Sequence, residues 1–188
     1  MVEMMSSFIR LTDEEKQGIM EAFPIKTYLK GTFLLKEGQI AKDAYFVIAG
    51  CIREYSMEDG EEKTTNFYTE FQSAGNFDSI ANNSPSKYFF ICTEDCSLAI
   101  INAEKENALY KKFPHFGEVC RVEMEKMLGA SQNEFSTFKN ASPKERYLNL
   151  LKNRPNLIQR VPQYHLASYL GIKPETLSRI RKRITFMD

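Results

Sequence analysis

The pattern of apolar and polar residues changes along the 188-residue chain. From Ile25 to about Glu104, short apolar runs such as TFLL, AYFVIAGCIREY and YFFIC are separated by turn residues at the spacing of short strands. Asp59 and Gly60 have the composition of a hairpin tip. No helical period separates these runs, so the pattern predicts a closed or rolled antiparallel sheet.

A short helix is predicted before this sheet. Thr12 is a suitable N-cap in the segment LTDEEKQGIMEAF, and Pro24 ends the helical pattern. The apolar residues expected to dock this helix are Leu11, Ile19, Met20 and Phe23.

A long helix is predicted after the sheet. Its apolar or small residues are separated by threes and fours, the spacing of one helical face: Phe113, Phe116, Cys120, Met124, Met127, Ser131, Phe135 and Phe138. A helix of roughly 22 residues is about 33 Å long, which exceeds what one small sheet covers. We expect a parallel homodimer seam along this face. Packing of the face on its own domain stays open as an alternative.

The last part of the chain predicts a helix-turn-helix. A new helix begins with Ser142 as N-cap, Pro143 in the first turn and Glu145 at the capping-box position, which places a domain boundary near Asn140. In VPQYHLASYLGIKPETLSRIRKRI, Ala167 is the small residue and Gly171 the turn residue that two steeply crossing helices need. Pro174 starts the second helix, and the inward positions hold Leu166, Leu170, Ile172, Leu177 and Ile180.

Charge is divided unequally along the chain. From Lys139 onward there are 11 basic and 3 acidic residues, whereas the preceding part has 14 basic and 22 acidic residues. A patterned, strongly basic end is expected to meet a polyanion such as double-stranded DNA. Outward positions of the second helix suit base edges or phosphates: Glu175, Thr176, Ser178, Arg179 and Lys182.

The segment PQYHLASYLGIKPETLSRIRKRI resembles the DNA-reading end of the Crp/Fnr family of bacterial transcription regulators, and the glycine pattern of KGTFLLKEG and AYFVIAGCIREY is similar to that family's N-terminal roll. The resemblance implies an α+β chain with a cyclic-nucleotide-binding-like β-roll (1–110), a dimerisation helix (111–140) and a helix-turn-helix domain (141–188). It also implies a homodimer on a palindromic site, with RNA polymerase as a candidate partner. The base-reading residues would be Glu175, Ser178 and Arg179. The residues near phosphates or in auxiliary roles would be Gln163, Tyr164, Thr176, Arg181, Lys182 and Arg183.

The cyclic-nucleotide pattern of the family is incomplete in this chain. Gly75 is retained, but Asn76 stands where nucleotide-binding members have an acid and Ser86 where they have Arg. Serine cannot reproduce the bidentate phosphate contact of an Arg, so we expect no cAMP binding. An unknown effector pocket formed by Phe67, Phe77, Lys87 and Tyr88 is one interpretation, and a role of these aromatic residues in the core is the other.

No cofactor or catalytic site is expected. The cysteines Cys51, Cys92, Cys96 and Cys120 are scattered as in a reduced protein, and the first lies too late for the N-terminal iron–sulfur pattern of the family. Neither His115 nor His165 lies at a spacing typical of metal ligands. There is no secretory signal and no membrane span in the pattern, so a cytoplasmic protein is expected.

The favoured function is a dimeric, sequence-specific DNA-binding regulator that is not an enzyme and uses an effector other than cAMP, or none. The alternative is a small-molecule sensor that acts mainly through protein contacts.

Overall fold

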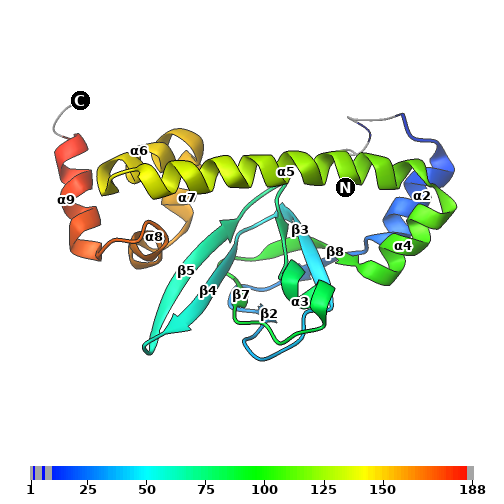
Figure 1. Cartoon of the computed structure of the whole chain (residues 1–188), viewed down its shortest axis with the longest axis horizontal. Coiled ribbons are helices and arrows are strands. Elements are labelled where there is room, and N and C mark those ends of the chain that lie inside the picture. The colour runs from blue at the N-terminus through cyan, green and yellow to red at the C-terminus, as the bar shows by residue number, and fades with distance from the viewer. Residues whose placement is uncertain (1, 3–5, 7–9, 186–188) are drawn as a thin grey trace. The chain divides into compact units, whose positions relative to one another are not determined.

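The computed structural model describes residues 2, 6 and 10–185, and the course of the chain is shown in Figure 1. The chain divides into two compact units. The first contains Met1–Glu54 and Phe67–Met127, and the second contains Tyr55–Asn66 and Leu128–Asp188. One hairpin and one long helix therefore contribute residues to both units.

Within the described residues, eight strands form two four-stranded sheets with the orders β1-β8-β3-β6 and β2-β7-β4-β5. The strands are β1 (Ile25–Tyr28), β2 (Phe33–Leu35), β3 (Asp43–Ala49), β4 (Ile52–Glu58), β5 (Glu61–Tyr68), β6 (Ser73–Ala74), β7 (Phe89–Cys92) and β8 (Cys96–Asn102). β8 pairs antiparallel with both β1 and β3. The predicted rolled antiparallel sheet and the α+β class are confirmed.

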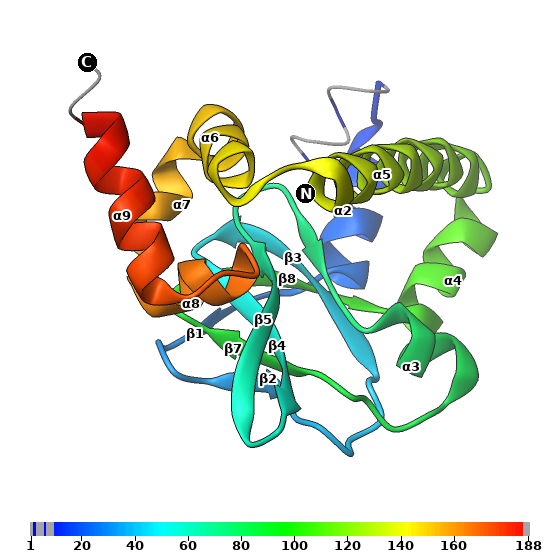
Figure 2. The same ribbon diagram turned by 60° about the vertical axis from the view of Figure 1, so that its left-hand side comes forward.

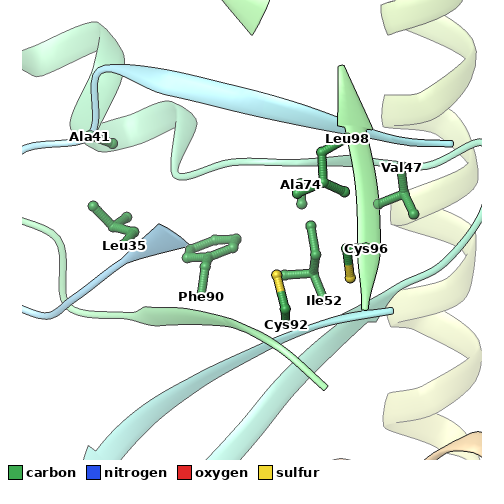
Figure 3. Packing of buried hydrophobic residues seen from close by; sticks show 9 residues of the cluster. All are labelled: Leu35, Ala41, Val47, Ile52, Ala74, Phe90, Cys92, Cys96 and Leu98. Carbon is green, nitrogen blue, oxygen red and sulfur yellow. The ribbon is translucent and has the colours of Figure 1, made fainter. Parts of the chain in front are cut away.

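A core of apolar side chains from both sheets fills the roll (Figure 3). Val47 of β3, Ile52 of β4 and Leu98 of β8 are completely buried. Their burial follows from the alternation of strand residues between the two faces of a sheet, which turns every second residue inward. Figure 3 labels the cluster, which consists of Leu35, Ala41, Val47, Ile52, Ala74, Phe90, Cys92, Cys96 and Leu98.

The turn between β4 and β5 lies where the sequence predicts a hairpin tip. Asp59 and Gly60 have φ angles of 53° and 79°. Two consecutive residues with positive φ are characteristic of the type I′ hairpin turn, whose twist matches that of the flanking strands. This prediction is confirmed.

A short helix, α3 (Phe77–Asn82), lies between β6 and β7, where the sequence pattern predicted no helix. Six residues are too few to show a helical period. Local capping defines this helix instead: the side chain of Asn76 accepts a hydrogen bond from the Ser79 amide (3.1 Å), and Asn83 ends it with a φ of 50°.

Besides α3, the described part of the first unit contains α2 (Asp13–Ala22), α4 (Ala103–Lys112) and the beginning of α5 (His115–Asn140). Ile19 of α2 and Phe116 of α5 are both fully buried in one apolar cluster with residues of β3 and β8. Thr12 forms the predicted N-cap of α2. The expectation for Met20 is wrong: it is exposed, because Ile19 and Phe23, four residues apart, occupy the buried face of that helix.

The apolar face of α5 has two parts. Its beginning is buried with its own unit: Phe116 is fully buried and Phe113, just before the helix, is partly buried against the same cluster. The prediction that both belong to a dimer seam is therefore wrong. Further along, Met124, Met127 and Phe135 are exposed, as is Leu128, which the spacing argument omitted.

Four helices complete the second unit: α6 (Pro143–Asn153), α7 (Pro155–Arg160), α8 (Gln163–Tyr169) and α9 (Pro174–Thr185). The amide of Ser142 donates to the carboxylate of Glu145 (2.7 Å), and the hydroxyl of Ser142 accepts from the Glu145 amide (3.4 Å). This reciprocal pair is the predicted capping box at the start of α6.

Candidate nucleic-acid interface

The helices α8 and α9 form the predicted helix-turn-helix. Leu166 and Ala167 of α8 and Leu177 of α9 have no exposed surface, and Leu170 at the end of α8 is almost completely buried. Ala167 has the small side chain that close approach of two helices requires. These contacts orient the remaining faces of both helices outward.

Gly171 makes the turn between the two helices. Its φ is 66°, a left-handed conformation that glycine adopts without strain. A Cβ atom at this position would also lie 3.2 Å from Nη1 of Arg146, a tight contact that the guanidinium would have to shift to relieve.

Arg146 of α6 connects the turn with the end of α5. Its Nη1 donates to the carbonyl oxygen of Leu170 (3.1 Å). Its Nε donates to the carbonyl oxygens of Phe138 (3.2 Å) and Ala141 (3.1 Å), which satisfies groups at the end of α5. The sequence analysis missed this residue, since its position inside an amphipathic helix carries no signal of three separate acceptors.

The base-reading residues implied by the resemblance lie on the outer face of α9. Glu175, Ser178 and Arg179 are all exposed. The guanidinium of Arg179 donates to the hydroxyl of Thr176 at 3.3 Å, a hydrogen bond between neighbouring turns of the helix. This bond holds the Arg179 side chain along the exposed face, and it leaves other donors of the guanidinium available to a base edge.

The auxiliary residues lie on two elements. Gln163 and Tyr164 begin α8 and are exposed, with the Tyr164 ring 4.0 Å from the ring of His165. In the last turns of α9, Lys182 and Arg183 are exposed, whereas Arg181 is half-buried and has an interaction of its own. The helix-turn-helix thus combines the exposed starts of α8 and α9 with the cations Arg181, Lys182 and Arg183 at the end of α9.

A pocket of about 340 Å³ lies beside Arg146, among α5, α6 and α8 of the second unit. The hydroxyl of Tyr169 donates to the carboxylate of Glu134 at 3.4 Å on its wall. Burial raises the pKa of Tyr169, so this phenol remains protonated and acts as a donor.

The positions that would hold a nucleotide phosphate form a closed hydrogen-bond network. The side-chain amide of Asn76 donates to the hydroxyl of Ser86 (2.8 Å), which in turn donates to the carbonyl oxygen of Tyr88 (2.9 Å). Ser86 is buried, with 3% of its surface exposed. Asn76 and Ser86 therefore bind each other and the backbone, and neither is positively charged.

The residues suggested for an effector pocket have different environments. Phe67 is fully buried, and Tyr88 is half-buried and packs against the core of the roll. Phe77 and Lys87 are exposed. The fully buried Phe67 and the half-buried Tyr88 fit the core interpretation.

The cysteines of the roll are buried. Cys51, Cys92 and Cys96 lie in its interior, and a hydrogen bond with Cys96 together with burial raises the pKa of the Cys92 thiol. Such thiols are poor nucleophiles and poor metal ligands. Among residues 2, 6 and 10–185, no group of three or more His, Cys, Asp or Glu side chains is arranged to hold a metal ion.

Comparison with protein families identifies one domain. Residues 25–113 match the family model described as the cyclic nucleotide-binding domain. This part of the chain is therefore similar to cyclic nucleotide-binding domains. The roll, the long helix and the helix-turn-helix follow one another in the order predicted from the Crp/Fnr resemblance, so the predicted fold is confirmed. None of the curated proteins matches the chain significantly.

Solved structures share this fold over nearly the whole chain. The catabolite activator protein of Thermus thermophilus is 21% identical, with 96% of this chain and 86% of that chain covered and a TM-score of 0.55. The c-di-GMP-responsive global regulator CLP of Xanthomonas campestris is 19% identical, with 93% and 92% covered and a TM-score of 0.68. FixK2 of Bradyrhizobium japonicum is 14% identical, with 88% and 85% covered and a TM-score of 0.72. In the described part of the chain, none of the helices has the length and apolar character needed to cross a bilayer.

Proposed function

We propose that the chain is a sequence-specific DNA-binding transcription regulator that acts as a homodimer and has no catalytic activity. The observation that carries this proposal is the exposed outer face of α9. There Glu175, Ser178 and Arg179 can accept or donate at base edges in a major groove. Neighbouring cations of the same helix supply contacts to phosphates, which position a reader without specifying sequence.

The exposed part of α5 supports the dimer. Met124, Leu128 and Phe135 recur at intervals of four and seven residues and are 64%, 61% and 69% exposed. Apolar side chains at such a spacing match the seam of a two-stranded coiled coil. Two copies joined along this face would carry two reading helices, which suits a palindromic site.

An effector of this regulator would differ from cAMP. Asn76 and Ser86 hydrogen-bond with each other where an acid and an Arg would hold the cyclic phosphate. The c-di-GMP response stated for CLP is a property of that protein, which is 19% identical to this chain.

The experiment that tests the proposal selects bound duplexes from a random pool with the full-length protein. We expect a two-fold-symmetric consensus whose half-sites are centred about 34 Å, or one helical turn, apart. Titration of the consensus and of a scrambled duplex at fixed salt would then give the specificity ratio. Equal affinity for the two duplexes would contradict the proposal.

A matched pair of variants makes the test specific to α9. Replacement of Ser178 and Arg179 by Ala should abolish the preference for the consensus. Replacement of Lys30 and Lys36, exposed cations of the roll, by Ala removes at least as much charge and should leave the preference intact.

A further inference from the structure

β5 is the outermost strand of its sheet, and one of its edges is covered by a helix of the second unit. In the order β2-β7-β4-β5, only one edge of β5 pairs with another strand. The other edge would present unpaired amide and carbonyl groups. Figure 2 shows α8 beside this edge, and the part of the hairpin from Tyr55 to Asn66 belongs to the same compact unit as α8.

The hydroxyl of Ser168 on α8 satisfies two groups of this edge. The amide of Thr64 donates to Ser168 Oγ at 2.9 Å, and the hydroxyl donates to the carbonyl oxygen of Glu62 at 3.4 Å. A serine hydroxyl can accept and donate at the same time. Thr64 is only 6% exposed, so water cannot readily replace the hydroxyl as the acceptor for its amide.

The segment that Ser168 holds is strongly acidic. The hairpin tip carries Glu58, Asp59, Glu61 and Glu62, and a single cation, Lys63, which forms an ion pair with Glu61 (2.5 Å). Ser168 is five residues after Gln163, which corresponds to about 7.5 Å along the helix axis. This separation is shorter than the Debye length, which is about 10 Å at 0.1 M salt. Negative charge held near Ser168 is therefore only partly screened at the start of α8.

We propose that the β4–β5 hairpin (Tyr55–Asn66) is an acidic restraint on the helix-turn-helix, attached through Ser168. While attached, its negative charge lowers the affinity of the domain for DNA, and release raises that affinity. The inference rests on the proposed function, because it assigns a form of regulation to the same DNA-binding surface. The restraint acts through charge and does not cover the reading face, since Glu175, Ser178 and Arg179 are exposed while the contact is present.

The contact itself can be tested without DNA. Hydrogen exchange of the Thr64 amide, followed by NMR in the full-length protein, should become at least tenfold faster in Ser168→Ala. Ser168→Thr retains a hydroxyl and should preserve the protection. Amides of β5 that pair with β4 provide the internal control and should be unaffected. Unchanged exchange at Thr64 in Ser168→Ala would overturn the inference.

The effect on DNA can be tested with two independent ways of breaking the contact. Ser168→Ala removes the hydroxyl, and Thr64→Pro removes the amide donor at an edge where proline is tolerated because its nitrogen faces away from the partner strand. Thr64→Val retains the amide and is the matched control. We expect both contact-breaking variants to bind a random-sequence duplex severalfold more tightly at 50 mM salt, with a smaller gain at 300 mM salt.

A double-mutant cycle links the gain to the charge of the hairpin. Replacement of Glu61 and Glu62 by Gln should raise DNA affinity when Ser168 is present and add nothing in Ser168→Ala. Unchanged or weaker binding in Ser168→Ala and Thr64→Pro, with thermal melting showing folded protein, would overturn the restraint. If the wild-type protein binds no duplex at any salt concentration, the proposed function fails, and the exchange experiment still decides whether the contact exists.

Discussion

The guanidinium of Arg146 lies over the aromatic ring of Phe138, with 4.1 Å between its carbon and the ring centroid. The same guanidinium donates to three carbonyl groups, two at the end of α5 and one, that of Leu170, before the turn of the helix-turn-helix. Planar stacking and forked hydrogen bonding are both properties of arginine that lysine lacks. Arg146 therefore fixes the geometry of the connection between the long helix α5 and the helix-turn-helix.

Arg146→Ala should lower the free energy of unfolding by about 1.5–3 kcal/mol, the usual contribution of hydrogen bonds to a charged group. Arg146→Lys should lose most of this amount, because an ammonium group cannot reach all three carbonyls from one side chain. Urea unfolding followed by circular dichroism measures the change. Lys144→Ala, an exposed cation of the same helix, is the control. Stability equal to that of the control would refute the role assigned to Arg146.

Arg179→Ala and Lys182→Ala should have different effects on DNA binding. Loss of a base-reading Arg should cost about 1–3 kcal/mol on the consensus and relax specificity at one base pair. Loss of a phosphate-contacting Lys should weaken all sequences alike and reduce the salt slope by about one unit. Titrations of consensus and scrambled duplexes at several salt concentrations distinguish the two. Identical behaviour of the variants would contradict the separation of roles on α9.

Leu128→Glu should convert the proposed dimer into monomers. A carboxylate at the centre of the exposed apolar part of α5 would face its own copy in a parallel seam, where two like charges cannot be buried. Sedimentation or light scattering of the full-length protein measures the molecular mass. Asn133→Glu adds the same charge on the opposite side of the helix and should leave the dimer intact. A dimer that survives Leu128→Glu would place the interface elsewhere.

The sequence predicted those parts of the fold that local chemistry determines. The capping boxes at Thr12 and Ser142, the positive φ at Asp59 and Gly60, and the left-handed turn at Gly171 each depend on a few adjacent residues. The inward residues of the helix-turn-helix followed from helical period alone. The same period assigns the remaining positions of α9 to its outer face, so the exposure of Glu175, Ser178 and Arg179 also follows from local pattern.

The features that the sequence did not predict depend on contacts between distant residues. Phe116 has the spacing of a dimer seam, but it is buried by α2 and α4, and spacing cannot tell which partner covers an apolar face. Ser168 was not singled out at all, because its acceptor and donor partners lie more than 100 positions away in the chain. Arg146 was missed because backbone carbonyls leave no trace in a sequence.

Addition of cAMP should not change the stability of the protein. A ligand that binds only the folded state stabilises it by an amount that grows with concentration over the dissociation constant. Asn76 and Ser86 offer the cyclic phosphate no cation and are already hydrogen-bonded to each other. The melting temperature with about 1 mM cAMP should equal that with about 1 mM AMP, which is the control for general nucleotide effects. A shift seen with cAMP alone would show that other residues bind the nucleotide.

Protonation of the Glu15 carboxylate should make the protein less stable in acid. It accepts hydrogen bonds from the Thr12 amide (2.7 Å) and hydroxyl (2.9 Å), and it lies 3.1 Å from Nε2 of His115. The hydrogen bonds from Thr12 hold the pKa of Glu15 below its usual value of 4.5. A carboxyl whose pKa is lower in the folded state stabilises that state above its unfolded pKa, and this stabilisation is lost as the pH falls through the folded value.

Glu15→Gln should therefore melt at a lower temperature than the wild type at pH 6, and the difference should shrink as the pH falls through the lowered pKa of Glu15, because the wild-type carboxyl becomes protonated as well. Thermal melts at half-unit pH intervals would show the two curves converging on the acid side. Glu37→Gln, which changes an exposed carboxylate at a turn of the roll, should show no such convergence. A difference between Glu15→Gln and the wild type that stays constant from pH 6 to pH 3 would mean that Glu15 acts through packing, because only a charged group loses its contribution on protonation.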